Sequence, residues 1–482
     1  MSHSATTTPS QDEKKSPLDT YTTSPPSSSP EVLVGEVSEV FEANEVFRKN
    51  AAVNFRTVGW PRASVIFLKV IFATGVLSIP TAMVSLGAVG GALNVVGWGV
   101  FNTYTAIIQG DFRNRHAGCH SIADMAEKVG GGVMREVCGG LFIIAYVLCS
   151  GSGIIGVSVG LNALSRHAAC TVWWAFLATC VVCATASVRK FHQIGWLTWA
   201  GFLSIFVAVL IVVIAVTTRS RPAAAPATGD FDLGYYVVPQ SVTFAAGVVG
   251  STTIFVSSAG TSAFLPVISE MKNPKDYRKA VYVCMSIVTA AYLSFSLVVY
   301  RWAGQWVASP SLGSAGQTVK MVAYGIGLVG LIVSACLYLH VAAKYCFVRI
   351  LRKSRHLQDN TLIHWGTWLG CVWSLGFLAF ILAEAIPIFN YLIALTGSLC
   401  FAPLAISLPG WLWLYDHRDW MKGSLLQQAT FWFHALLIPL GLFFLVGGTY
   451  GVIKEIVAAY ADGLIGSAFS CADNSGSTGG SH

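Results

Sequence analysis

The sequence predicts an all-α polytopic membrane protein with eleven transmembrane helices. Of its 482 residues, 54% are hydrophobic and only 11% are charged, whereas soluble domains carry about 25% charged residues. Apolar segments recur along the chain, each near the ~20 residues that cross the hydrocarbon core as a helix. None shows the alternating polar and apolar pattern of a membrane β-barrel. These observations exclude an ordinary water-soluble enzyme.

The N-terminal segment, residues 1–55, is expected to be a disordered cytosolic tail. Residues 1–46 hold two lysines against eight acidic residues, a net charge of −6, which leaves +13 on the remainder. The opening stretch is rich in Ser, Thr and Pro without an apolar run, so no signal peptide is expected. Its hydroxyl residues and Lys14 and Lys15 are candidate targets of a kinase or of ubiquitin; a plain solvated tail is the alternative.

Eleven apolar segments follow, and their lengths of 20–28 residues suit tilted helices. They lie at 62–86, 88–109, 137–163, 169–188, 193–217, 241–268, 280–302, 319–346, 362–383, 387–414 and 427–449. We expect one membrane domain over 56–450. Its first ten spans fall into two groups of five, 62–217 and 241–414, and 427–449 is an extra helix.

The orientation follows from the basic residues in the connections. With a cytosolic N-terminus, the inward connections hold 21 Lys and Arg residues and the outward ones hold six. Cytoplasmic loops carry such an excess, so the positive charge is explained by topology and no nucleic-acid partner is expected. An odd number of spans then places the C-terminal tail, 451–482, outside. In the longest inner connection, Ser121 and Asp124 resemble the capped start of a short helix.

Two spans carry the pattern of a broken helix. ATGVLSIP at 73–80 lies in the first span and SAGTSAFLP at 258–266 in the sixth, each with a central Gly and a later Pro. Backbone groups freed by such residues are tolerated in a bilayer where they line a cavity. Close packing by small residues is the alternative. Matched interruptions in two halves indicate the site of a secondary transporter, and the odd repeat of five spans makes the second half inverted.

Several motifs resemble the fungal branch of the amino acid/auxin permease family, above all its neutral amino acid permeases. They are FRTVGWPR at 55–62, FATGVLSIP at 72–80, GCHSIADMAEKVGG at 118–131, HQIGWLTW at 192–199 and FVSSAGTSAFLPVISEMKNP at 255–274. The resemblance covers about residues 55–450. It implies a LeuT-type fold of five plus five inverted helices and proton-coupled uptake of amino acids.

The expected substrate site lies between the two breaks. Helix N-termini present amides to a carboxylate, and unwound carbonyls face an ammonium group. The amides of Gly75, Val76 and Leu77 are expected at the carboxylate. The other expected substrate-binding residues are the carbonyls of Ala73, Ser257, Ser258 and Gly260, the hydroxyls of Thr74, Ser78, Thr261 and Ser262, and Phe255 as a lid. The family's architecture adds Tyr146 and Tyr338, for which ordinary packing is the alternative.

Proton coupling is expected at Lys69, with Glu270 and Ser334 as the other candidates. A lysine near the inner end of a span can snorkel to water, which is one interpretation. In the other, its ammonium lies near Ser334 on the eighth span, in the volume that sodium fills in sodium-driven relatives. Some proton-coupled relatives use a lysine in the fifth span, but the fifth span here has no charge. Glu270 is expected to pair with Lys69 or with Arg278.

Among the twelve cysteines, Cys170 and Cys471 are the pair expected to face an oxidising compartment together. They are disulfide candidates, and two thiols too far apart to bond are the alternative. Cys180 and Cys183 lie inside a span without a second pair, and the eleven histidines are scattered. No metal site or cofactor is therefore expected.

The sequence thus predicts a secondary active transporter, a symporter of protons and neutral, including aromatic, amino acids into the cell across the plasma membrane. A sensor, a receptor or a channel on the same fold remains an alternative, as does an amino acid exporter of the vacuolar membrane. An integral membrane enzyme is disfavoured, because no paired acids, His cluster or Ser–His arrangement lies at one membrane depth.

Overall fold

The regular secondary structure of the described residues is helical. The computed structural model describes residues 58–72, 75–116, 118–188, 191–239, 241–352, 354–357, 361–463 and 467–476. Within these ranges, one isolated parallel bridge joins Val58 to Met271 and the regular elements are helices. The all-α prediction is confirmed. The predicted N-terminal tail, 1–55, with its candidate modification sites, lies outside the described residues.

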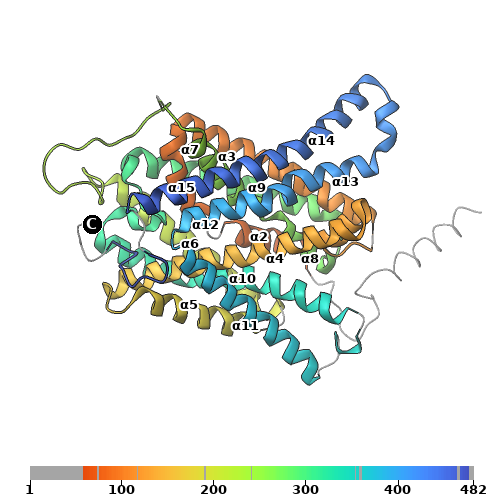
Figure 1. Cartoon of the computed structure of the whole chain (residues 1–482), viewed down its shortest axis with the longest axis horizontal. Coiled ribbons are helices and arrows are strands. Elements are labelled where there is room, and N and C mark those ends of the chain that lie inside the picture. Colours follow the sequence, from red (N-terminus) through yellow and green to blue (C-terminus); the bar gives the residue numbers. More distant parts are fainter. Residues whose placement is uncertain are drawn as a thin grey trace, which may run out of the picture. The chain divides into compact units, whose positions relative to one another are not determined.

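The first half of the membrane domain consists of five helices that run mostly side by side (Figure 1). They are α2 (Trp60–Ile71), α3 (Gly75–Arg115), α4 (Ile122–Ser165), α5 (Thr171–Ala186) and α6 (Phe191–Thr217).

The second half of the membrane domain contains the remaining helices. Its elements are α7 (Phe244–Ala259), the 3₁₀ turn η1 (Gly260–Phe264), α8 (Leu265–Glu270), α9 (Tyr277–Ala303), α10 (Gln317–Leu351), α11 (Leu362–Ala385), α12 (Phe389–Thr396), α13 (Leu408–Asp416), α14 (Leu425–Phe443) and α15 (Thr449–Ala461). Two π-helical turns, Gly397–Phe401 and Pro403–Ser407, join α12 to α13.

In the described part of the chain, eight helices are long and apolar enough to cross a membrane, and the bent α12–α13 pair makes a ninth. Among them, α3 has 41 residues, about 60 Å of helix, or twice the ~30 Å hydrocarbon core. Gly87 interrupts it with a φ of 72°, at the boundary predicted between the first two spans. The membrane character is therefore supported, while the count of eleven spans stays a prediction.

Two helix ends bear on the sequence predictions. The capped start at Ser121 is confirmed, because its side chain accepts a hydrogen bond from the amide of Asp124, whose carboxylate in turn accepts from the amide of Ser121. The last span was expected to end at residue 449. Instead, the chain continues through a π-helical turn into α15, which ends at Ala461, so part of the predicted C-terminal tail is helical.

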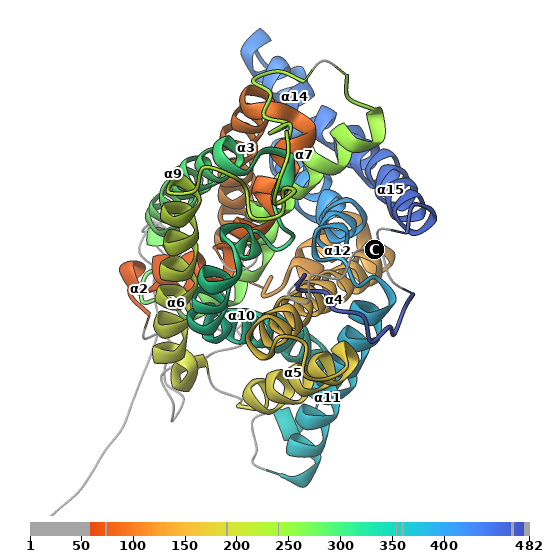
Figure 2. The same cartoon turned by 90° about the vertical axis from the view of Figure 1, so that its left-hand side faces the viewer.

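Helices of the first half pack directly on helices of the second half. Helix α3 packs mainly on α7 and α9, and α10 packs mainly on α4 and α6. Figure 2 shows α10 between α6 and α4. At the end where α3 meets α4, ion pairs join the halves. Asp111 accepts from Arg278 Nε at 2.9 Å, and Asp124 accepts from Arg352 at 2.9 Å. This packing brings the first and sixth predicted spans together at the centre.

Candidate functional site

The first helix break lies between α2 and α3. Helix α2 ends at Ile71, and α3 begins at Gly75. Ala73 and Thr74, both expected at the site, lie outside the described residues. Since the first N–H groups of a helix have no partner within it, Gly75 and the buried Val76 and Leu77 present their amides at the break.

The second break lies between α7 and α8. Helix α7 ends at Ala259, a 3₁₀ turn follows from Gly260 to Phe264, and Pro266 stands in the first turn of α8. Tighter 3₁₀ turns change which carbonyls are bonded, and Pro lacks an N–H to donate. The motif therefore interrupts the helix at the place that the sequence predicts.

The two breaks touch. The Ser257 hydroxyl lies 3.3 Å from the carbonyl oxygen of Gly75, and the hydroxyls of Ser78 and Ser257 are 3.4 Å apart. The Ser78 hydroxyl also donates to the Gly75 carbonyl at 2.9 Å. A Cβ at position 75 would lie 2.9 Å from the Ser257 Cβ, so only glycine permits this approach.

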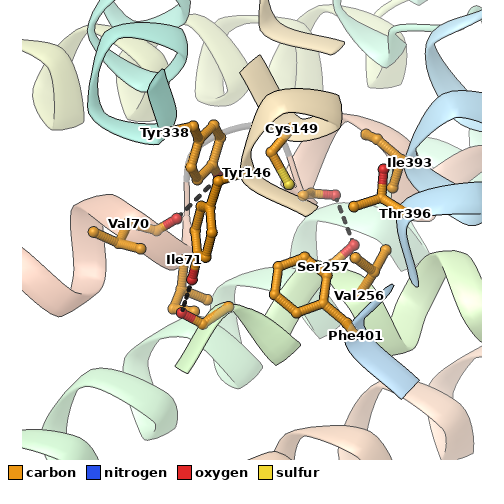
Figure 3. Close-up of a pocket in the computed structure, with 12 residues that line it drawn as sticks. Val70, Ile71, Tyr146, Cys149, Val256, Ser257, Tyr338, Ile393, Thr396 and Phe401 are labelled. Carbon is orange, nitrogen blue, oxygen red and sulfur yellow. Dashed lines mark hydrogen bonds between the residues drawn. The ribbon is translucent and has the colours of Figure 1, made fainter. Parts of the chain in front are cut away.

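A cavity opens beside the touching breaks (Figure 3). It is partly open, and the figure of about 410 Å³ for its space free of protein atoms includes open solvent. Its lining residues are uncharged: Val70, Ile71, Gly75, Tyr146, Cys149, Val256, Ser257, Gly260, Tyr338, Ile393, Thr396 and Phe401. Five of them are residues that the sequence predicts for the site, namely Gly75, Ser257, Gly260, Tyr146 and Tyr338.

Tyrosine hydroxyls reach the freed carbonyls from neighbouring helices. The Tyr146 hydroxyl of α4 donates to the carbonyl of Gly260 at 3.2 Å and lies 2.9 Å from the Ser262 hydroxyl. The Tyr338 hydroxyl of α10 donates to the carbonyl of Val70 at 3.0 Å. Figure 3 shows the two rings together over the first break. Both tyrosines therefore contact the breaks directly.

Other predicted residues lie around the site without lining the cavity. Phe255, expected as a lid, is buried with its ring 4.8 Å from that of Trp98. The Asn102 amide of α3 donates to the Phe255 carbonyl at 3.1 Å and to the Ser258 hydroxyl at 2.8 Å. The buried Thr261 hydroxyl has no hydrogen-bond partner among the described residues.

Lys69 is fully buried on α2. Its Nζ donates to the Ser334 hydroxyl at 2.9 Å and to the Gly330 carbonyl at 3.2 Å, both on α10. The position near Ser334 is one of the two that the sequence analysis names for this lysine. The other, a side chain that snorkels to water, does not agree with full burial.

Both pairings expected for Glu270 are wrong. Its carboxylate lies 3.6 Å from Lys344 Nζ on α10, while Arg278 pairs with Asp111. The reason is that α8 ends beside α10, whereas Arg278 on α9 faces the end of α3.

Cys170 and Cys471 are joined by a disulfide in the structure, with Cα atoms 4.5 Å apart. Hydrogen bonds join the residues that follow Cys471 in the chain to the ends of three helices. The Thr171 hydroxyl donates to the Ala472 carbonyl at 2.6 Å, the buried Asn162 amide donates to Asn474 at 2.8 Å, and Lys320 Nζ donates to the Ser475 carbonyl at 2.8 Å. No group of His, Cys, Asp and Glu suited to a metal occurs in the described part.

Sequence reasoning missed the contribution of the tenth predicted span. Ile393, Thr396 and Phe401 line the cavity where π-helical turns bend the α12–α13 pair by 42°. The signal was present, because Thr396, Gly397 and Ser398 precede Pro403 just as small residues precede Pro in the two breaks. Cys149 and Val256 also line the cavity, and their small uncharged side chains gave no sign of a binding role, although Val256 stands inside the motif that identifies the second break.

The broken helices, the buried amine and the uncharged cavity define a membrane transporter with paired discontinuous helices. The family model of the transmembrane amino acid transporter proteins matches residues 56–454. The chain belongs to this family of membrane transporters, not to a family of enzymes.

Relatives and solved structures agree with this assignment. A protein named transmembrane transporter from Gibberella moniliformis (strain M3125 / FGSC 7600) is 50% identical over 96% of this chain and 98% of its own. The N amino acid transport system protein of Neurospora crassa is 26% identical over 87% of this chain and 89% of its own. The structure of Mhp1, a nucleobase-cation-symport-1 transporter, in a closed conformation with bromovinylhydantoin bound is 12% identical in sequence. It matches with a TM-score of 0.54 over 88% of this chain and 96% of the Mhp1 chain. The likeness to Mhp1 confirms the LeuT-type fold.

Proposed function

We propose that the protein is a proton-coupled symporter that carries neutral amino acids, aromatic ones included, into the cell across the plasma membrane. The observation that carries the proposal is the uncharged cavity at the junction of two helix breaks, with the buried Lys69 amine beside it. The Neurospora relative, named as an amino acid transport protein, supports the substrate class.

The substrate's two charges match the two kinds of helix end. Its carboxylate binds the amides of Gly75, Val76 and Leu77, because the first turn of a helix offers unpaired N–H groups and a positive dipole. Its ammonium binds carbonyls of the breaks, including those of Ser257 and Gly260. A side chain without charge fits the remaining lining, since burying a charge without a partner is costly.

Lys69 supplies the coupling in this proposal. Its amine joins α2 to α10 through Ser334 and Gly330, and a proton gained or lost there changes the strength of that link. A fixed amine in this position takes the place of a bound sodium ion, so transport depends on pH and not on sodium.

Uptake of radiolabelled amino acids into proteoliposomes tests the proposal. An inward proton gradient is expected to drive accumulation of a neutral amino acid, whereas a sodium gradient of equal size has no effect. Lysine and glutamate serve as charged controls. Absence of uptake for every amino acid would contradict the function, and uptake that follows sodium would contradict the coupling.

The proposed topology puts the N-terminus in the cytosol and the C-terminus outside, as the charge bias predicts. The disulfide between Cys170 and Cys471 supports it, because disulfides persist on the oxidising side of a membrane. The N-terminal tail, as a cytosolic segment, is a proposed target of a kinase or of ubiquitin. In a vacuolar exporter the N-terminal tail would also face the cytosol, and the disulfide would face the vacuolar lumen. The location of a fluorescently tagged protein in the cell therefore distinguishes the plasma membrane from the vacuolar membrane.

A further inference from the structure

Tyr292 stands between the two helix breaks without lining the cavity. It belongs to α9 and is buried, with its ring 5.7 Å from that of Phe72 in a stacked arrangement. Its hydroxyl lies 2.7 Å from the Ile71 carbonyl at the end of α2 and 3.0 Å from the Ser257 carbonyl of α7. One side chain of a third helix thus contacts the freed carbonyls of both breaks.

The glycine at position 75 makes room for this hydroxyl. A Cβ there would lie 2.7 Å from the Tyr292 hydroxyl oxygen, closer than real Cβ contacts. By contrast, a Cβ at Gly260 would meet only the Ile71 side chain, at 3.4 Å. The requirement for glycine in the first break therefore comes partly from Tyr292, before any substrate is considered.

We propose that Tyr292 is a positioning residue that ties the two breaks together and fixes the carbonyls that receive the substrate's ammonium. The inference rests on the proposed amino acid site. Buried carbonyls in a membrane need a donor, and the hydroxyl has a single proton to share between Ile71 and Ser257. The shared bond sets the distance between the breaks, and the ammonium binds the carbonyl array in that geometry.

The same helix provides a matched control. Tyr277, also buried on α9, donates from its hydroxyl to the Ala106 carbonyl at 3.1 Å. Ala106 lies within the regular part of α3 and belongs to neither break. Tyr277→Phe therefore removes the same kind of bond from the same helix, and any difference from Tyr292→Phe reports on the breaks.

Transport kinetics give the first test. In proteoliposomes, Tyr292→Phe is expected to raise the KM for a neutral amino acid about five- to tenfold, whereas Tyr277→Phe leaves the KM unchanged. The corresponding α-hydroxy acid, which lacks the ammonium, is used as a competitor. The unaltered protein is expected to bind the α-hydroxy acid more weakly than the amino acid. This difference in affinity becomes smaller in Tyr292→Phe only, because the substitution disorders the carbonyls that bind the ammonium. An unchanged KM and an unchanged preference would overturn the proposal.

Amide hydrogen exchange gives a second test that needs no substrate. Peptides that cover residues 70–78 and 253–264 are expected to exchange about tenfold faster in Tyr292→Phe than in the unaltered protein and in Tyr277→Phe. Equal exchange in both variants would overturn the proposal even if transport were lost. If the unaltered protein carries no amino acid but the exchange difference is found, the proposed function fails and the link between the breaks stands.

Discussion

Replacement of Lys69 by methionine is expected to abolish accumulation driven by the proton gradient while the protein still folds. Methionine keeps most of the apolar stem, which packs so closely on α6 that a Cβ at Gly201 would lie 3.1 Å from Lys69 Cε. The polar partners also stay satisfied, because the Ser334 hydroxyl donates to the Gly330 carbonyl at 2.6 Å without help from the lysine. The substitution therefore removes the titrating amine and little else.

The size of the effect follows from the gradient. Two pH units correspond to about 2.7 kcal/mol per proton, which supports roughly 100-fold accumulation at one proton per substrate. With the membrane potential clamped at zero, the unaltered protein is expected to approach this ratio. The Lys69→Met variant only equilibrates the substrate, to a ratio of about one, and its rate no longer depends on external pH.

Lys320→Met is the matched control. Lys320 is also a buried lysine, and its Nζ donates to the Ser475 carbonyl at 2.8 Å, but it stands in the first turn of α10, well before Lys69's partners on that helix. This variant is expected to keep the accumulation ratio. Accumulation and a pH profile in Lys69→Met that match those of the unaltered protein would refute the assignment of coupling to this amine.

Four further outcomes are expected. Gly75→Ala abolishes uptake and Gly260→Ala retains a measurable part of it, because a Cβ meets atoms at 2.7 Å at the first position and at 3.4 Å at the second; equal loss in variants with equal surface levels would contradict the geometry. Cys149 lines the cavity, so a transported amino acid slows its alkylation, as mass spectrometry of the peptide measures; alkylation at the same rate with and without substrate would place the substrate elsewhere. Mass spectrometry of the unreduced protein recovers Cys170 and Cys471 in one disulfide-linked pair of peptides. Alkylation of both thiols without prior reduction would contradict the bond. Tags on the two termini label from opposite sides of the membrane in intact and permeabilised cells, and labelling from one side would require an even number of spans.

Most of the fold was predictable because the bilayer allows few solutions. Each of the eleven apolar segments coincides with helix in the described structure, and the break at Gly87 falls between 62–86 and 88–109 as expected. The length of the last apolar run alone predicts an end of the span at 449. Thr449 to Ala461 contains charge at Lys454 and Glu455, yet the residues continue as a helix that packs on α7 and α12.

The site was predictable where backbone chemistry determines it. Gly75 and Gly260, with their following prolines, identify both breaks from the sequence alone. Side chains that approach from other helices were accessible only through the family's architecture, as for Tyr146 and Tyr338, or not at all. Tyr292 is one of 16 tyrosines, and nothing in its neighbourhood along the chain distinguishes it; its role depends on how α9 crosses the breaks.

The balance of donors and acceptors at the breaks bears directly on the kind of substrate. Four carbonyls, those of Val70, Ile71, Ser257 and Gly260, receive only three tyrosine hydroxyl protons. An ammonium group brings three N–H donors to acceptors that are short of them, and no lining carboxylate is needed to hold it. A second positive charge on the substrate's side chain would find no acidic partner in the same lining. This balance supports the proposed substrate, an α-amino acid with an uncharged side chain, whose own carboxylate balances its ammonium and in the proposal meets the amides at the start of α3.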